Sequence, residues 1–469
     1  MTQIASAPTP VADPGVPRED VPTQRGDADQ RPAPLRRALR FELVKLFSQW
    51  PVRLMLLACC VGPAIFVVVV GHQSALPSDT VFGRWMGQTG WAGPLVVLAF
   101  ACSWGLPLIT SLVAGDVFAV EDRLGTWRHL LMAVRSPRQI FVAKSVASLC
   151  VIGLFVVGLA LSAVLGGLLA AGSAPLVGLD GHALSAGSAA GTVTLAWIAA
   201  LAPTLAFAAV GLLGSVAVGR SPMGLIVPAL FALLLQLAQL LPLPVVVRIA
   251  LPSYAFIAWR GLFTDPGQVG PLAVGIAVDL VWALVATVIA YRLFLRRDFT
   301  DLTYDGIGRR VLGRAVAPLA AVLVATVGVI AGTTQASGSG IDRAKLDRSL
   351  ATSFAHLYVR QTDELHRPRV TEGDLRTSAA CDKGGGSVDD VGPGNDWRCV
   401  VRWTLPGSSA TGQAIYQLDV TPDGRYVADG DGPQPVNGFF QVRTDGGDVP
   451  NPLWQFDGTV DLLTANRRG

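Results

Sequence analysis

The chain has 469 residues, of which 51% are hydrophobic and only 15% are charged, and its mean hydropathy is positive. This composition excludes an ordinary soluble domain and predicts a membrane protein. The formal net charge of +3 is too small to favour nucleic-acid binding. None of the four lysines, Lys45, Lys144, Lys345 and Lys383, stands in the GxxxxGK(S/T) context that binds nucleotide phosphates. No P-loop is therefore predicted.

Residues 1–34 are rich in Pro, Ala, Asp and Thr without hydrophobic periodicity, which predicts a disordered cytoplasmic tail. In residues 35–50, leucines then recur at helical spacing, with Arg36, Arg37 and Arg40 away from their stripe. A basic amphipathic helix directly before an apolar run is expected to lie in the membrane interface. A short cytoplasmic packing helix is the alternative.

Seven apolar runs follow, each near or above the ~20 residues that a helix needs to cross a bilayer. They lie at residues 52–71, 93–114, 145–172, 193–219, 223–241, 271–293 and 315–333. If the N-terminus is cytoplasmic, seventeen Lys and Arg residues fall in segments on the cytoplasmic side of the membrane. Only Arg84, Arg248 and Arg260 then fall in short segments on the outer side. Because basic residues gather on the cytoplasmic side, the N-terminus is predicted inside and the C-terminus outside.

The connection between the second and third runs, residues 116–144, is a charged amphipathic segment. Leu124, Trp127, Leu131 and Val134 form an apolar stripe at helical spacing. The following Ser136-Pro137-Arg138-Gln139 is a capping box with the favoured proline at the first helical position. A short helix is therefore predicted to end near Arg135 and a new one to begin at Pro137. An ordinary interfacial loop helix fits the same pattern.

Polar residues also occur inside the apolar runs. Asp279 is the clearest case, because an intramembrane carboxylate usually faces a bundle interior or a water-filled path. A hydrogen-bonded structural carboxylate is equally compatible, and Gln236 and Gln239 are weaker cases of the same kind. Residues 242–270 are too apolar for a solvated loop but are broken by prolines, which predicts a re-entrant pair of short helices. A small-residue stripe in the third run (Gly158, Ser162, Gly166 and Ala170) predicts close helix packing within the bundle, or a dimer seam.

The predicted fold is an all-α polytopic membrane bundle with a small extracytoplasmic α+β domain. Residues 51–298 form a six-span domain, 299–314 a cytoplasmic linker, 315–333 a seventh transmembrane helix and 334–469 the outer domain. In the outer domain a helix is expected over 341–362 and strands over 399–405, 413–420, 425–428 and 438–443. Its aromatic residues are expected mainly in the core, with a binding patch as the alternative: Trp397, Trp403, Phe439, Phe440 and Trp454.

Cys381 and Cys399 lie in a polar, Gly-rich part of this domain. Outside the cytoplasm they are expected to form a disulfide, which would contribute roughly 3 kcal/mol to stability; two free thiols are the alternative. The other four cysteines lie in apolar runs and are expected to be buried and inert: Cys59, Cys60, Cys102 and Cys150. The histidines show no metal-binding or catalytic spacing, so neither a metal site nor a catalytic residue is predicted.

Several of these features together resemble the permease subunits of ABC transporters of the type 2 export class. The resemblance covers residues 35 to about 299 and begins with the interfacial "elbow" helix at 41–47. The connection 116–144 carries the family's pattern at Glu121, Gly125-Thr126, Leu130-Leu131, Ser136-Pro137-Arg138 and Lys144. The short Arg220-Ser221-Pro222 link, the re-entrant pair and the Arg-Arg-Asp end at 296–298 complete it. A typical permease of this class ends after span six, so the seventh helix and the outer domain depart from the family.

The resemblance implies a half-transporter in the cytoplasmic (plasma) membrane that pairs as a homodimer or with a related permease. ATP and Mg²⁺ would bind to a separate ATPase chain, so this chain would be no enzyme by itself and would hold no cofactor. Segment 116–144 would couple to that ATPase through Glu121, Arg123, Gly125, Thr126, Trp127, Arg128, Ser136, Pro137 and Arg138. Of these, Glu121, Arg123, Trp127 and Arg128 are expected to form the contact surface. A receptor or scaffold that displays the outer domain is the alternative, and a proton-coupled transporter using Asp279 is a third hypothesis.

Overall fold

The computed structural model describes residues 34–73, 76–77, 80–134, 136–218, 223–297, 309–334, 338–444 and 447–463. Several predicted features lie outside these residues. They are the tail up to residue 33, Arg135, the Arg220-Ser221-Pro222 link, Asp298 and most of the linker 299–314.

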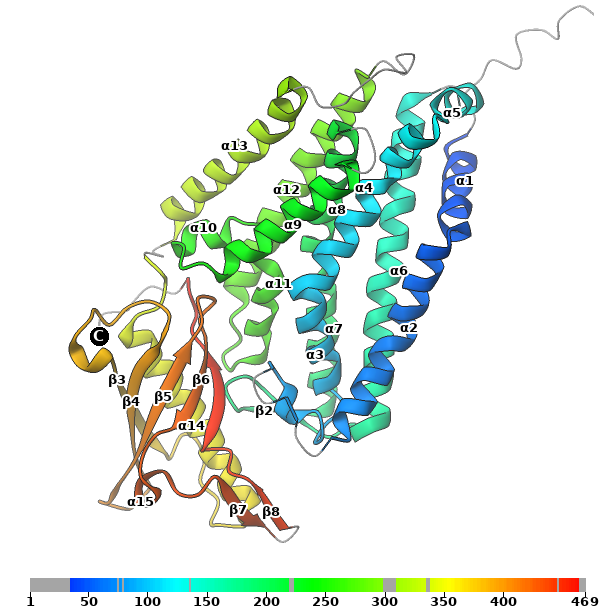
Figure 1. Cartoon of the computed structure of the whole chain (residues 1–469). Helices are drawn as coiled ribbons and strands as arrows, with labels where there is room; N and C mark the ends of the chain where they lie inside the picture. The colour runs from blue at the N-terminus through cyan, green and yellow to red at the C-terminus, as the bar shows by residue number, and fades with distance from the viewer. Residues whose placement is uncertain are drawn as a thin grey trace, which may run out of the picture.

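The N-terminal part is a helical bundle (Figure 1). Its main helices are α1 (Leu35–Ser48), α2 (Trp50–Gly71), α3 (Ala92–Phe100), α4 (Leu106–Leu124), α5 (Trp127–Val134), α6 (Pro137–Ala171), α7 (Ala186–Ala199), α8 (Leu201–Val218), α9 (Met223–Leu240), α12 (Val269–Leu295) and α13 (Arg309–Thr333). In the described ranges, six helical stretches are long and apolar enough to cross a membrane. The fifth predicted run is the exception, because α9 contributes only a shorter apolar helix, Ile226–Leu240.

The predicted re-entrant pair corresponds to three short helices between α9 and α12. They are α10 (Val245–Ile249), α11 (Ala255–Ala258) and the 3₁₀ turn η4 (Trp259–Phe263). Proline at 244, 252 and 266 prevents one continuous helix here, because proline lacks the N–H that a helix interior needs. These helices lie at the end of the bundle that is nearer the C-terminal domain (Figure 1).

The second membrane-crossing stretch is not a uniform α-helix. A π-helical turn, η3 (Ala101–Gly105), joins α3 to α4. The carbonyl of Cys102 in this turn accepts a hydrogen bond from the Gln236 side chain of α9, at 3.2 Å. Wide turns of this kind are rare inside helices and often occur at functional positions.

The small-residue stripe of α6 packs against α2, as the intramolecular alternative predicts. A Cβ atom at Gly166 would lie 2.6 Å from the Cα atom of Ala64, so only glycine allows this approach. The Ser162 hydroxyl accepts a hydrogen bond from the backbone N–H of Ala64 at 3.0 Å. Two of the cysteines expected to be buried, Cys60 and Cys150, are instead exposed on the bundle surface.

The C-terminal domain (residues 338–463) is a helix packed on an antiparallel sheet, which confirms the α+β prediction. Helix α14 (Arg343–Glu364) lies along a five-stranded sheet of order β3-β4-β5-β6-β9. The strands are β3 (Arg376–Lys383), β4 (Gly394–Thr404), β5 (Thr411–Val420), β6 (Arg425–Gly430) and β9 (Gln455–Thr459), and a separate hairpin joins β7 (Gln441–Thr444) to β8 (Gly447–Pro450). Strands β3, β8 and β9 were not expected from the sequence.

The predicted disulfide is present and joins the neighbouring strands β3 and β4. Cys381 and Cys399 face each other in the register of this strand pair, and both are buried. Trp397 belongs to the core, as expected. Phe439 and Phe440 do not, because the loop before β7 displays both side chains to solvent.

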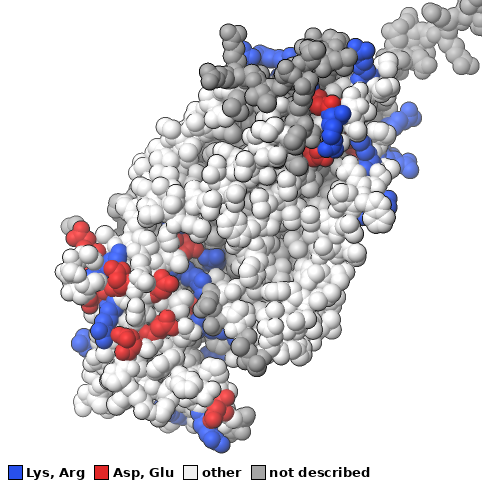
Figure 2. All heavy atoms as spheres, in the orientation of Figure 1, with Lys and Arg blue, Asp and Glu red and all other residues white. Residues whose placement is uncertain are grey.

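Charged side chains are unevenly distributed over the molecule. On the face drawn in Figure 2, they gather at the end of the bundle that carries α1 and α5 and on the C-terminal domain. The surface between these two regions is almost free of Lys, Arg, Asp and Glu (Figure 2). An uncharged belt over the long apolar helices is what a bilayer requires, because charged side chains inside the hydrocarbon core are costly.

Candidate functional site

The connection from α4 to α6 is built by local signals at both of its corners. Helix α4 ends at Leu124, and Gly125 adopts a left-handed conformation (φ 65°) that a side chain would disfavour. Helix α5 then runs from Trp127 to Val134. The Ser136 hydroxyl accepts a hydrogen bond from the Gln139 N–H at 3.4 Å, and Pro137 opens α6. The Ser136 N-cap and the two-helix division of this connection are therefore confirmed. The capping box is only half formed, because the Gln139 side-chain oxygen has no hydrogen-bond partner among the described residues.

A buried group of charges holds the base of this connection. The carboxylate of Glu121, 1% exposed, accepts hydrogen bonds from the Lys144 ammonium at 2.6 Å, from Lys45 and from the Thr126 hydroxyl. Lys144, also 1% exposed, donates a second hydrogen bond to Glu42 at 3.0 Å. These contacts tie α1, α4 and α6 together. Removing one member would leave the opposite charge buried without compensation, which is strongly destabilising.

Trp127 anchors α5 to the bundle. Its ring stacks on Phe118, with ring centroids 6.4 Å apart, and packs against Phe294 of α12. The indole N–H donates a hydrogen bond to Asp122 at 2.6 Å. Arg297, just after α12, donates to the same carboxylate at 2.9 Å, and its guanidinium lies 5.7 Å from the Trp127 ring. The end of α12 is thus joined to the end of α4 and to α5.

This geometry corrects the predicted contact surface. The side chains of Glu121 and Trp127 (6% exposed) point into the protein, because both complete networks formed with distant helices. The exposed residues on α5 are Arg128, His129, Met132 and Ala133, and Arg123 is exposed on the last turn of α4. Arg138 is exposed at the start of α6, whereas Ser136 and Thr126 act locally through their hydrogen bonds. The predicted apolar stripe of this connection is only partly buried, because Leu124 is exposed whereas Trp127 and Val134 are buried.

The intramembrane polar residues fall into two groups. Gln236 and Gln239 have partners: Gln236 bonds to η3, and Gln239 donates to the Arg248 carbonyl and to the Ser253 hydroxyl at 3.1 and 2.9 Å. Asp279 on α12 is 0% exposed, and neither of its carboxylate oxygens has a hydrogen-bond partner among the described residues. Its participation in transport stays a prediction.

Three arginines fasten the C-terminal domain to the bundle. They are Arg84, Arg248 and Arg260, the residues that the charge count assigns to short segments on the second side of the membrane. Arg248 donates to the Pro422 carbonyl, and Arg260 pairs with Asp423 in the same β5–β6 turn. Arg84 donates to the Gln455 carbonyl of β9 and lies 3.4 Å from the Asp457 carboxylate.

The shape of the β5–β6 turn fits this docking site. Gly424 has φ 85°, and a Cβ atom there would lie 2.9 Å from the Val460 carbonyl oxygen. The Thr421 hydroxyl bonds to Asp423 and so orients the carboxylate. Burial raises the pKa of Asp423, but the charge of Arg260 and the Thr421 hydrogen bond outweigh burial and hold that pKa below its usual value.

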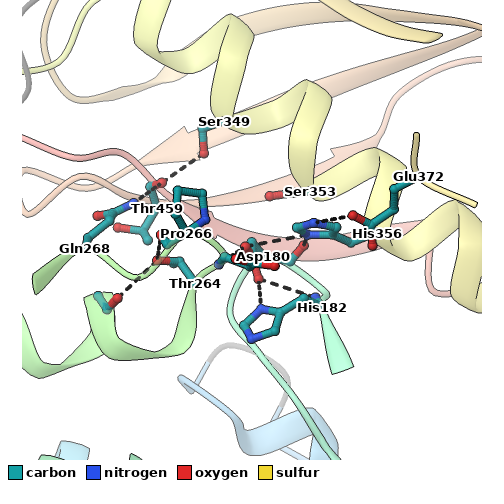
Figure 3. Close-up of polar contacts among 12 residues, drawn as sticks. Asp180, His182, Thr264, Pro266, Gln268, Ser349, Ser353, His356, Glu372 and Thr459 are labelled. Carbon is teal, nitrogen blue, oxygen red and sulfur yellow. Dashed lines mark hydrogen bonds and ion pairs between the residues drawn. The ribbon is translucent and has the colours of Figure 1, made fainter. Parts of the chain in front are cut away.

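A fourth contact between the two parts is a histidine–carboxylate cluster (Figure 3). Asp180, in the α6–α7 connection, bonds to the His182 ring and accepts the backbone N–H of Asp265 at 2.7 Å. From α14, His356 places Nδ1 3.1 Å from the Asp180 carbonyl oxygen and Nε2 3.2 Å from the Glu372 carboxylate. In the described ranges no three His, Cys, Asp or Glu residues are arranged to hold a metal ion.

The Asp180–His182 pair predicts a pH-dependent junction. Burial opposes the charged forms, but the mutual hydrogen bond and opposite charges outweigh it, raising the pKa of His182 and lowering the pKa of Asp180. The stabilisation is therefore fully present between about pH 4 and 6.5. It is lost as pH rises through the elevated His182 pKa, or falls through the depressed Asp180 pKa. Hydrogen exchange of residues 176–184, and of α14 through the Asp180–His356 contact, should accelerate as pH rises through the elevated His182 pKa.

His182→Gln should abolish most of this pH dependence, whereas His72→Gln, at an exposed histidine after α2, should leave it intact. The same acceleration in wild type and His182→Gln, after correction for intrinsic exchange, would contradict the prediction.

Several of these residues were not expected from the sequence. Lys45 meets Glu121, and Glu42 meets Lys144, only because α1 packs beside α6. Asp180 likewise meets His356, and Asp423 meets Arg260, from distant segments. One signal was available: two of only four lysines, Lys45 and Lys144, converge on Glu121. A scarce lysine in an apolar context indicates a paired charge.

Comparison with known proteins finds one family model that is similar to part of the chain. Residues 38–218 match a family model described as "ABC-2 family transporter protein". The matched region includes α2 through α8, and therefore the whole α4–α6 connection, but neither α13 nor the C-terminal domain. No curated protein matches the chain.

Proposed function

We propose that this chain, whose residues 38–218 match the ABC-2 family model, is an ABC-2 type permease and the membrane subunit of an exporter that is powered by a separate ATPase chain. The observation that carries the proposal is α5, a short helix anchored on three long helices with one face left exposed. An element of this kind can receive a push from a partner and pass it on as a movement of whole helices.

The anchoring contacts define where such a push goes. Force on α5 reaches α4 and α6 through the Glu121–Lys144 pair, and α12 through Trp127, Asp122 and Arg297. All three are membrane-crossing helices. Closure of two ATPase subunits would then tilt these helices between inward- and outward-open states, and the substrate would cross the membrane by alternating access.

In this proposal α1 and α5 lie on the cytoplasmic side of the membrane and the C-terminal domain lies on the opposite side. The excess of Lys and Arg at the α1 and α5 end supports this orientation. The Cys381–Cys399 disulfide supports it as well, since disulfides persist in oxidising compartments. Two copies, or this chain and a related permease, would pair around the transport path.

Changes on the exposed face of α5 should uncouple transport without unfolding the protein. Arg128→Glu combined with Met132→Ala should reduce affinity for the ATPase at least tenfold, because central Arg contacts often contribute 2 kcal/mol or more. Binding to a candidate ATPase subunit, and ATP turnover in proteoliposomes, would be measured together. Arg37→Glu, at an exposed arginine of α1, is the matched charge-reversal control.

Unchanged ATPase binding and turnover in the α5 variant would contradict the proposed contact. ATP turnover that moves no cargo would instead favour the receptor or scaffold.

A further inference from the structure

A cavity of about 280 Å³ opens between α1, the beginning of α2, α4 and α6. Its charged end is lined by Lys45 and Arg123, and its apolar wall includes Met55, Val113 and Phe155. Asp116 lies between them, about 10 Å along α4 from Arg123. It lies outside the exposed α5 face. The cavity combines a charged end with an apolar wall, and this combination is complementary to an amphipathic ligand.

The cavity runs along the helices for about the depth of one leaflet. On α4 the lining residues extend from Arg123 to Leu112, and on α6 from Lys144 to Phe155. At 1.5 Å per residue each of these intervals is roughly 16 Å long. Half of a ~30 Å hydrocarbon core is about 15 Å. Trp50 and Pro51 begin the first membrane-crossing helix beside the charged end, so that end lies at the membrane boundary.

Asp116 distinguishes this cavity from a merely apolar groove. Its side chain is half-buried, and in the described part of the chain it has no hydrogen-bond or ion-pair partner. Lys45, by contrast, already pairs with Glu121, and Lys144 pairs with both Glu121 and Glu42. The Asp116 carboxylate therefore lacks hydrogen-bond donors. A carboxylate removed from water needs such donors, preferably on a cation.

We propose that this cavity binds one phospholipid with a primary-ammonium headgroup, of the phosphatidylethanolamine type, from the adjacent leaflet. The ammonium N–H groups donate to Asp116, and one acyl chain lies along Met55, Val113 and Phe155. A phosphatidylcholine headgroup has a cation without N–H donors, and phosphatidylglycerol has hydroxyl donors without a cation. The inference requires only that the bundle crosses a membrane, and it is independent of the transport cycle.

The test uses the full chain, delipidated in detergent, without an ATPase. It is incubated with equal amounts of phosphatidylethanolamine, phosphatidylcholine and phosphatidylglycerol of matched acyl chains, and retained lipid is measured by native mass spectrometry. One phosphatidylethanolamine per chain should be retained with about tenfold preference, the size expected for one charge-assisted hydrogen bond. Asp116→Asn should remove this preference, and Asp116→Glu should keep most of it.

Met55→Trp, which fills the apolar wall, should reduce retention of every lipid at this site. Leu284→Trp is the matched control, because Leu284 is 65% exposed on α12, away from the cavity. Equal retention of the three lipids by the wild type would overturn the proposal. A preference that persists in both Asp116→Asn and Met55→Trp would also overturn it, since the lipid would then bind elsewhere.

Discussion

Glu121→Ala is expected to destabilise the protein by about 3–5 kcal/mol, the cost of breaking a buried ion pair from one side. Lys144 would keep Glu42 but lose its 2.6 Å contact to Glu121, in a site where it is almost completely buried. Lys45 and Thr126 would lose the same carboxylate. Thermal unfolding of the purified protein, followed at several detergent concentrations, would measure the loss.

Glu121→Gln should cost less, because the amide oxygen can still accept one of these hydrogen bonds. Arg128→Ala, at an exposed position on the next helix, α5, should leave the unfolding temperature unchanged. A Glu121→Ala protein as stable as the wild type, yet deficient in ATPase binding, would return Glu121 to the contact surface first predicted for it. The two roles are therefore separable: structural residues change unfolding, and contact residues change partner affinity.

Asp423→Ala is expected to release the C-terminal domain from the bundle, at a cost of about 3 kcal/mol. Arg260 would remain largely buried without its carboxylate, and the turn that also binds Arg248 would lose its anchor. Hydrogen exchange should then accelerate in two separate places, at residues 245–263 and at residues 421–426. The internal exchange of β3 and β4 should not change, because their disulfide and their register lie away from the junction.

Asp389→Ala is the matched control for that experiment, since Asp389 is an exposed carboxylate in the same domain. Acceleration over the whole C-terminal domain would indicate unfolding rather than release. No acceleration on either side of the junction would show that the remaining arginine contacts are sufficient for docking.

Local signals account for what the sequence predicted well. The apolar runs located the membrane-crossing helices, and Ser136, Pro137 and Gly125 marked the corners of the α4–α6 connection. The disulfide followed from two cysteines in a polar region. Each of these features depends on residues that are neighbours in the chain, or on composition over one element.

Long-range packing explains what the sequence did not predict. Periodicity shows which residues share a helix face but not which neighbour that face meets. Trp127 was expected at a partner surface because tryptophan is common in interface hot spots, whereas its ring packs on Phe118. Strand β9 is short and contains Asp457 and Gly458, which are poor strand formers. It is stabilised by antiparallel pairing with β6, a long-range contact that its own sequence does not indicate. Arg248 and Arg260 were informative for orientation, but their docking partners lie more than 160 residues away.

The π-helical turn at Ala101–Gly105 has a consequence for mapping the second membrane-crossing helix. One additional residue in a turn rotates everything after it by about 100° relative to an uninterrupted α-helix. In both α3 and α4 the lipid-facing positions recur with the helical period. The set of positions that faces lipid in α4 is rotated by about 100° from the set that α3 would predict. A cysteine-accessibility scan along residues 92–124 should show a single phase jump between Ala101 and Gly105. Any alignment that assumes one continuous helical wheel will misplace the positions on one side of that turn by about 100°.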